Sequence, residues 1–155
     1  MPKSTEPLLD ADGALLVDLV SAAAQALEVN RDTINALNVF PVPDGDTGTN
    51  MLLTVKSVLD DLNGYASSSI EEISKKMASS ALLGARGNSG LILAQFFKGL
   101  SEALDGESKL TGKQFARSIR IAATKSYGVV PNPVEGTMLT VYSECAEVGE
   151  NSSAH

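Results

Sequence analysis

Apolar side chains recur every three or four positions along most of the chain, which is the spacing of one face of an amphipathic helix. Runs of aromatic and β-branched residues, which are typical of strands, are scarce. Segments with the helical pattern lie at about 13–36, 51–62, 70–81, 91–104, 112–123 and 138–145. The sequence therefore predicts an all-α fold in which antiparallel helices are joined by short loops.

Local sequence signals mark several of the helix ends. Asn63–Gly64 is a stop signal at the end of the second segment. Ser69 with Glu72, and Thr111 with Gln114, have the spacing of a capping box, in which two side chains satisfy free backbone N–H groups at a helix start. These two pairs predict where the third and fifth helices begin.

Composition narrows the chemistry that is possible. The chain has 155 residues, of which 43% are hydrophobic and 20% charged, as in an ordinary globular domain. Cys145 is the one cysteine and His155, the last residue, is the one histidine. These counts exclude an intrachain disulfide, a zinc cluster and nucleophilic catalysis with a histidine base. The formal net charge of −7 argues against a nucleic-acid partner.

We expect the protein to be cytoplasmic. No apolar run reaches the ~18 residues that a membrane-spanning helix needs. The first residues also lack a basic patch followed by an apolar stretch, so they do not form a secretory signal. The sequence thus predicts no membrane span.

One segment, Asn38–Asn50, has features that a simple connector does not need. Two prolines stiffen it, and Gly45 allows a sharp turn so that Asp44 and Asp46 can point into the same space. A divalent cation relieves the repulsion between two carboxylates, and oxygen ligands suit Mg²⁺ or Ca²⁺ rather than Zn²⁺. The alternative is ordinary turn chemistry, with Asp46 capping a helix that begins near Thr47. Both interpretations stay open.

Two further loops, Gly84–Gly90 and Asn132–Met138, also lead into helices through small residues. A helix start presents free N–H groups and the positive end of the helix dipole, which suit a phosphate group. Gly84–Gly90 is neither a Walker A loop nor a Rossmann fingerprint, and taken alone a glycine-rich turn is its simpler explanation. Met138 could offer a polarizable surface to a flat ring, although methionine at helical spacing usually belongs to the core.

Taken together, the three loops indicate a nucleotide site. Each is a small-residue loop at a helix start, and one of them carries the paired carboxylates. Arg86 is the only basic residue within them. Metal ions rather than lysines would have to neutralise the phosphates, so such a site would be metal-dependent.

The motifs Leu37–Met51, Gly84–Gly90 and Pro133–Leu139 resemble, in the same order, the DhaL-type nucleotide-binding domain of the dihydroxyacetone (glycerone) kinase family. The long first motif is most similar to the N-terminal kinase domain of bacterial fatty acid kinase. The similarity covers residues 9–148, and we expect residues 149–155 to form a frayed polar tail. The resemblance implies a barrel of antiparallel helices that holds ATP and two Mg²⁺ ions at one end.

The resemblance also implies roles for individual residues. The metal ligands would be Asn38, Asp44 and Asp46. The nucleotide would be bound by Thr47, Gly48, Thr49, Asn50, Gly87, Asn88, Ser89, Gly90, Thr137 and Met138, of which the last two would lie near the base. Phosphoryl transfer depends on positioning and charge neutralisation, so no catalytic residue is expected beyond the metal ligands.

The same resemblance implies a partner protein that presents the substrate, which is an acyl-binding protein in the fatty acid kinases. The family's domain continues past its third motif into a helix and a glycine-rich loop without a match here, so we expect a truncated barrel that needs the missing C-terminal segments. Asn38 replaces a third aspartate of dihydroxyacetone kinases, which should loosen the second metal.

Residue chemistry alone leaves other functions open. It does not choose between an acyl and a ketose substrate. A non-catalytic, truncated helical module that binds nucleotide or metal weakly, or that only associates with other chains, is the alternative to a kinase domain. An incomplete barrel would expose apolar helix faces, which favour association.

Overall fold

The computed structural model describes residues 11–40 and 42–153, and the regular structure within them is helical apart from one bridge. The described helices are α1 (Gly13–Ala36), α2 (Thr47–Leu62), α3 (Ile70–Gly84), α4 (Gly87–Ala103), α5 (Gly112–Gly128) and α6 (Met138–Ser152). The bridge pairs Ala11 with Leu110 and ties the chain before α1 to the chain before α5. The predicted all-α fold is confirmed.

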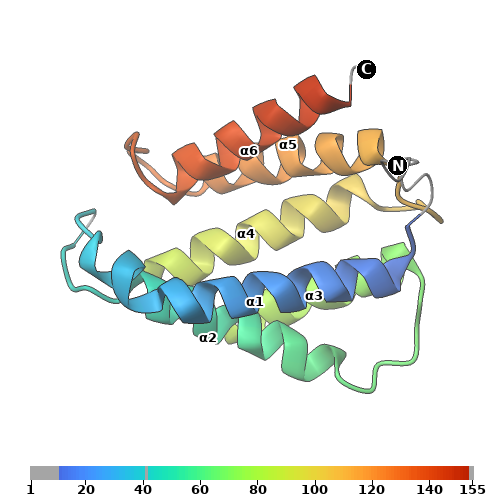
Figure 1. The fold of residues 1–155 in the computed structure, drawn as a ribbon, viewed down its shortest axis with the longest axis horizontal. Helices are drawn as coiled ribbons and strands as arrows, with labels where there is room; N and C mark the ends of the chain where they lie inside the picture. Colours follow the sequence, from blue (N-terminus) through green and yellow to red (C-terminus); the bar gives the residue numbers. More distant parts are fainter. Residues whose placement is uncertain (1–10, 41, 154–155) are drawn as a thin grey trace, which may run out of the picture.

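Successive helices run in opposite directions (Figure 1). α1, α3 and α5 begin at one end of the molecule, and α2, α4 and α6 begin at the other. α1 packs against α2 and α3, and both of these helices contact α4. On the other side of α4 lies α5, which packs against α6. Among the described residues α1 and α6 share no contact, so these helices form an open antiparallel bundle.

The core follows the helical pattern of the sequence most closely on α2 and α3. Val58 and Met77 are fully buried at their centre. On α1 the buried positions are Gly13, Leu16, Val20 and Ala24. Leu19, which the same pattern places on the apolar face, is 41% exposed because α1 lies at the edge of the bundle and has neighbours on one side only.

The two predicted capping boxes differ in outcome. At α5 the box is complete, because the Gln114 N–H donates to Thr111 Oγ1 (3.2 Å) and the Thr111 N–H donates to Gln114 Oε1 (2.9 Å). At α3 only half of it forms. Ser69 Oγ accepts from the Glu72 N–H (3.3 Å), but the Glu72 carboxylate accepts from the Ser67 hydroxyl instead of the Ser69 N–H. The predicted helix starts are nevertheless close to those observed.

Two helix boundaries differ from the prediction. α4 begins at Gly87 rather than near Leu91, so most of the expected glycine-rich loop is the first turn of a helix. α6 continues through Ser152, into the segment expected to fray, because Arg120 on α5 binds Glu150 through two hydrogen bonds (2.9 and 3.0 Å). Pro41, the predicted domain start at residue 9 and the last two residues of the predicted tail lie outside the described residues.

α1 is the one described helix that is long and apolar enough to cross a membrane, judged by length and composition alone. It has 24 residues, with a mean hydropathy of 1.2 over its most apolar window. The core helix of a globular domain meets the same criterion, and α1 packs its buried positions against α2 and α3. The sequence-based expectation of no membrane span therefore stays a prediction.

A groove of about 470 Å³ lies between α4, α5 and α6. Its walls are mostly apolar and include Phe96, Phe115, Ile119 and Tyr142. The rings of Phe96 and Tyr142 meet across the helices with centroids 4.6 Å apart. None of the residues predicted to bind metal or nucleotide lines this groove, so it is separate from the candidate site.

Candidate functional site

The predicted site residues lie at the end of the molecule where α2, α4 and α6 begin (Figure 1). In an antiparallel bundle, alternate helices start at the same end, so three motifs that are far apart in sequence share one end of the fold. Each motif is therefore positioned by the start of one of these helices.

The loop from α1 to α2 is braced by the side chain of Asn38. Its Oδ1 accepts a hydrogen bond from the Asp46 N–H (3.2 Å), and its Nδ2 donates to the Val42 carbonyl (3.0 Å). Gly45, with φ of 69°, turns the chain between the two aspartates in a conformation that favours glycine. Asn38 was predicted as a metal ligand, and that role stays a prediction; the structure shows it as the residue that closes the loop.

Asp44 and Asp46 carry the charge of this loop. Asp46 occupies the N-cap position of α2, yet its carboxylate makes no cap hydrogen bond. The neighbouring Asp46 carboxylate is the main cause that raises the pKa of Asp44 above its usual range. The alternative that Asp46 simply caps α2 through its side chain is therefore wrong. The Asp46 carboxylate lies close enough to Asp44 to disfavour the ionised form of Asp44.

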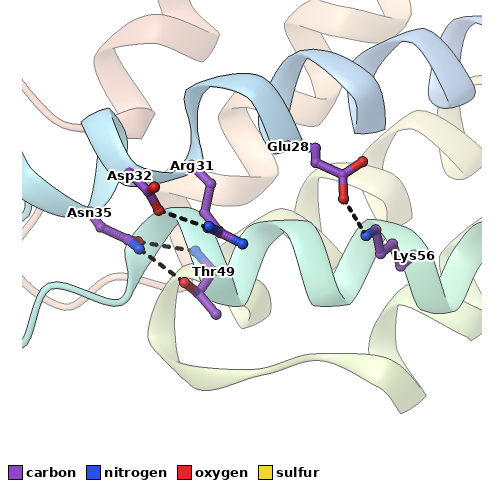
Figure 2. Close-up of polar contacts among 6 residues, drawn as sticks. All are labelled: Glu28, Arg31, Asp32, Asn35, Thr49 and Lys56. Atoms are coloured by element: carbon purple, nitrogen blue, oxygen red, sulfur yellow. Dashed lines mark hydrogen bonds and ion pairs between the residues drawn. The ribbon is translucent and has the colours of Figure 1, made fainter.

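The cap of α2 comes from α1 instead (Figure 2). The Thr49 N–H donates to Asn35 Oδ1 (3.1 Å), and Asn35 Nδ2 donates to Thr49 Oγ1 (2.9 Å). Asn35 was not among the residues predicted from the sequence. Its signal is its spacing, since Asn35 lies one helical turn after Arg31, whose backbone carbonyl lies next to Gly48 at the start of α2.

The start of α2 also lies unusually close to α1. A Cβ atom on Gly48 would stand 2.5 Å from the Arg31 carbonyl oxygen, which is closer than real side chains come. One side of this interface is further tied by an ion pair between Lys56 Nζ and Glu28 Oε1 (2.8 Å), seen in Figure 2. Glycine at position 48 is thus required by packing, and the tight packing places Thr49 within reach of Asn35.

The second motif meets the first at the start of α4. Ser89 Oγ donates to the Thr47 carbonyl (3.3 Å), and a Cβ on Gly87 would clash with the Asn50 side chain. Thr54, which is fully buried, links the two: its hydroxyl donates to the Asn50 carbonyl (2.8 Å) and accepts from the Arg86 N–H (3.2 Å). Thr54 was not predicted from the sequence, because a threonine inside a helix gives no distinctive signal.

The first turn of α4 has the free donors that an anion needs. The N–H groups of Gly87, Asn88 and Ser89 have no acceptor within the part of the chain that the structure describes, whereas the Gly90 N–H donates to the Arg86 carbonyl (3.0 Å). Such groups lie at the positive end of the helix dipole. The predicted phosphate-binding role of this turn is compatible with its geometry.

The third motif lies at the same end but is not joined to the other two by a hydrogen bond among the described residues. Thr137 Oγ1 donates to the Val134 carbonyl (2.8 Å), and Met138 is half-buried against the core. Glu135 orders the loop by accepting from the Tyr127 hydroxyl (3.1 Å) and the Thr140 hydroxyl (2.6 Å). α6 packs on α5 and also meets α4 where the rings of Tyr142 and Phe96 lie together. The structure therefore joins the first two motifs by a hydrogen bond and places the third at the same end of the bundle without such a bond among the described residues.

The donor set fits a Mg²⁺ ion that is shared with a ligand. Asp44 and Asp46 are two carboxylates, and no group of three or more metal-binding acids, histidines or cysteines occurs within the described ranges. Mg²⁺ commonly uses one or two carboxylates together with substrate phosphates and water. The residues present therefore suit a cation held jointly by the protein and phosphate oxygens.

Comparison with known proteins identifies the family. The sequence model of the DAK2 domain matches residues 41–155, which is more than half of the chain. The chain belongs to the DAK2 domain family. The DAK2 domain is a nucleotide-binding module of the dihydroxyacetone kinase family, in agreement with the resemblance of the three motifs.

Several similar curated proteins come from staphylococci and bear the name uncharacterized protein. One from Staphylococcus epidermidis is 43% identical over 136 residues, which is 88% of this chain and 25% of that protein. One from Staphylococcus haemolyticus is 42% identical over 142 residues, or 92% of this chain and 26% of that protein. A Staphylococcus aureus protein is 43% identical over 136 residues. The DAK2 chain thus spans about a quarter of the length of the curated relatives it matches.

Proposed function

We propose that this DAK2 domain binds ATP and Mg²⁺ for phosphoryl transfer in a kinase of the glycerone kinase family, with fatty acid kinase as the nearest activity. Two Mg²⁺ ions would accompany the nucleotide. A partner protein would present the substrate, an acyl group in the case of a fatty acid kinase, and the reaction would take place in the cytoplasm. Membership of the DAK2 family supports the kinase-type nucleotide module. The carboxylate pair supports the use of Mg²⁺, and the choice of fatty acid kinase rests on the resemblance of the first motif.

The observation that carries this proposal is the carboxylate pair at the start of α2. The Asp46 carboxylate lies within hydrogen-bonding reach of Asp44 and raises the pKa of Asp44, first through that hydrogen bond and further through its charge. The described structure gives Asp46 no side-chain cap bond that would compensate this repulsion. A divalent cation would compensate it directly.

Two helix starts would bind different parts of the ligand: the start of α2 would bind the cation, and the start of α4 would bind the phosphates. Asp44 and Asp46 would hold the cation, and the free N–H groups of Gly87, Asn88 and Ser89 would bind phosphate oxygens. Asn38 would keep the loop closed and, by its predicted role, add an amide oxygen. When bound, Mg²⁺ would neutralise phosphate charge during transfer.

The other predicted residues would complete the nucleotide pocket. Thr47, Gly48, Thr49 and Asn50 form the first turn of α2, beside the first turn of α4. Thr137 and Met138 would approach the base from the start of α6, which lies at the same end of the bundle. No hydrogen bond among the described residues joins this third motif to the other two.

Thermal unfolding with ATP and Mg²⁺, separately and together, tests the proposal. We expect a rise in Tm only when both are present, because a ligand that binds only the native state stabilises it, by about 2.7 kcal/mol at 100 times its Kd. Asp46→Ala should abolish the joint response. No response of the native chain to the two ligands together would overturn the proposal.

Asp12→Ala is the matched control, since Asp12 is also an aspartate at a helix N-cap. Its carboxylate caps α1 at the opposite end of the bundle, accepting from the N–H groups of Ala14 (3.0 Å) and Leu15 (3.3 Å). This variant should lose about 1 kcal/mol of stability and keep the full response to ATP with Mg²⁺. A folded native chain without any response would favour the alternative of a non-catalytic helical module that associates with other chains.

A further inference from the structure

Asp12 and Asp46 are the N-cap residues of two different helices, but only Asp12 makes side-chain cap hydrogen bonds. Asp12 precedes α1 with extended backbone (φ −103°, ψ −176°) and accepts from the second and third N–H groups of its own helix. Asp46 precedes α2 with ψ of 1° and accepts from neither. An aspartate at this position ordinarily does what Asp12 does, so the behaviour of Asp46 requires a cause.

Two asparagines supply that cause. Asn38 Oδ1 binds the Asp46 N–H and so holds the backbone of Asp46 away from the extended conformation of an ordinary cap. Asn35 Oδ1 takes the N–H of Thr49, the third residue of α2, which is one of the two donors that an N-cap aspartate uses. Because this N–H is already paired, the Asp46 carboxylate does not make the cap bond to Thr49.

We infer that Asn35 is a positioning residue of the proposed cation site: by capping α2 from α1, it keeps the Asp46 carboxylate available to a divalent cation. The inference rests on the proposed function. Asn35 touches neither of the aspartates through a hydrogen bond among the described residues, and it acts through the backbone of Thr49. Its amide is suited to this role because its oxygen and nitrogen are both paired with Thr49.

If the Asn35 side chain is removed, the Thr49 N–H and the cation compete for the Asp46 carboxylate. The Thr49 N–H loses its acceptor, and Asp46 is the side chain that a helix start provides for it. A cation would then have to displace this new cap bond. Because a cap is worth about 1 kcal/mol, Asn35→Ala should weaken the binding of ATP with Mg²⁺ about fivefold.

Residue-specific hydrogen exchange of backbone amides, measured by NMR without any ligand, tests whether Asp46 replaces Asn35 as the acceptor for the N–H of residue 49. We expect the amide of residue 49 to be protected in the native chain, in Asn35→Ala and in Asp46→Ala, because in each of them one acceptor remains. In the double variant both acceptors are gone, and exchange should be about fivefold faster than in either single variant. If Asn35→Ala alone exchanges as fast as the double variant, Asp46 does not take over and the inference is wrong.

Calorimetric titration of ATP at saturating Mg²⁺ supplies the functional test. Glu28→Gln is the matched control, since it breaks another contact between α1 and α2, the ion pair with Lys56, away from the start of α2. We expect Glu28→Gln to bind with native affinity and Asn35→Ala to bind about fivefold more weakly. Native affinity in Asn35→Ala overturns the inference alone, whereas absence of binding by the native chain overturns the proposed function and the inference together.

Discussion

The starts of α5 and α2 are stabilised in opposite ways. At α5, Thr111 and Gln114 satisfy each other's backbone N–H groups, so the helix carries its own cap. At α2 the cap comes from Asn35 on another helix, and the local aspartate, Asp46, makes no side-chain cap bond. A local cap uses up the polar side chains at a helix start, whereas a cap from another helix leaves them available to a ligand.

The carboxylates near the two helix starts also have different partners. Near α5, the Glu107 carboxylate accepts from Gln114 Nε2 (2.7 Å) and is part of the capped structure. Near α2, the closest charged neighbour that affects Asp44 is another carboxylate, that of Asp46, which raises the pKa of Asp44. At the start of α5 the nearby carboxylate is therefore paired within the chain, whereas at the start of α2 the proposed cation would be the partner of the two carboxylates.

The largest expected effect comes from a methyl group at the closest approach of α2 to α1. Gly48→Ala should lower the free energy of unfolding by about 2 kcal/mol, because the new Cβ would lie 2.5 Å from the Arg31 carbonyl oxygen. Urea denaturation measures the loss. The matched variant is Gly112→Ala in the first turn of α5, where nothing lies within 4 Å of a Cβ.

Gly112→Ala should leave stability unchanged or raise it by at most about 1 kcal/mol, since alanine has the higher helix propensity. Equal losses in the two variants would contradict the distinction between a helix start that depends on its neighbour and one that does not.

A smaller effect is expected when the local cap of α5 is removed. Thr111→Ala should cost about 1 kcal/mol, because the Gln114 N–H loses its acceptor. Chemical denaturation measures this loss, and thermal shifts should show an unchanged response to ATP with Mg²⁺, since the start of α5 lies at the opposite end of the bundle. A weakened ligand response would show that the two ends are not independent.

The smallest effect concerns the repulsion between the two carboxylates. The pKa of Asp44 is raised in the folded chain, so its ionised form opposes folding, and this cost grows as the pH rises from the ordinary aspartate range through the raised pKa. Without Mg²⁺, Asp44→Asn should therefore have a slightly higher Tm than the native chain at neutral pH. The difference should vanish in acid, where native Asp44 is protonated.

Asp32→Asn provides a control of opposite sign. The Arg31 guanidinium beside it (2.9 Å) lowers the pKa of Asp32, so its ionised form favours folding at neutral pH, and this contribution is lost as the pH falls through the lowered pKa. We expect Asp32→Asn to have a slightly lower Tm than the native chain at neutral pH. If both variants shift Tm in the same direction, repulsion between Asp44 and Asp46 is not the cause of the Asp44 effect.

Much of the fold could be predicted from local patterns. The apolar spacing of α2 and α3 matched their buried faces because each of these helices has neighbours around most of its apolar side. The spacing was less accurate on α1, where Leu19 is exposed, because periodicity does not reveal that a helix lies at the edge of a bundle. The Thr111 box was predicted correctly since both partners lie within one turn.

The candidate site was predictable only in part. The carboxylate pair was found because Asp44, Gly45 and Asp46 are adjacent in sequence. Asn35 and Thr54 were not found, because each acts on a residue that becomes its neighbour only when two helices pack or when a loop folds back. Polar residues inside helices have no signature until their partners are known.

The sequence by itself determined that the chain is helical, where most helices begin, and that two aspartates share a turn, since these properties depend on residues a few positions apart. Only the tertiary structure decided that Asn35 rather than Asp46 caps α2, and that the first turns of α2 and α4 meet through Ser89 and Thr47. The physical reason is that a hydrogen bond goes to the nearest suitably placed acceptor, and packing of distant segments determines which acceptor that is.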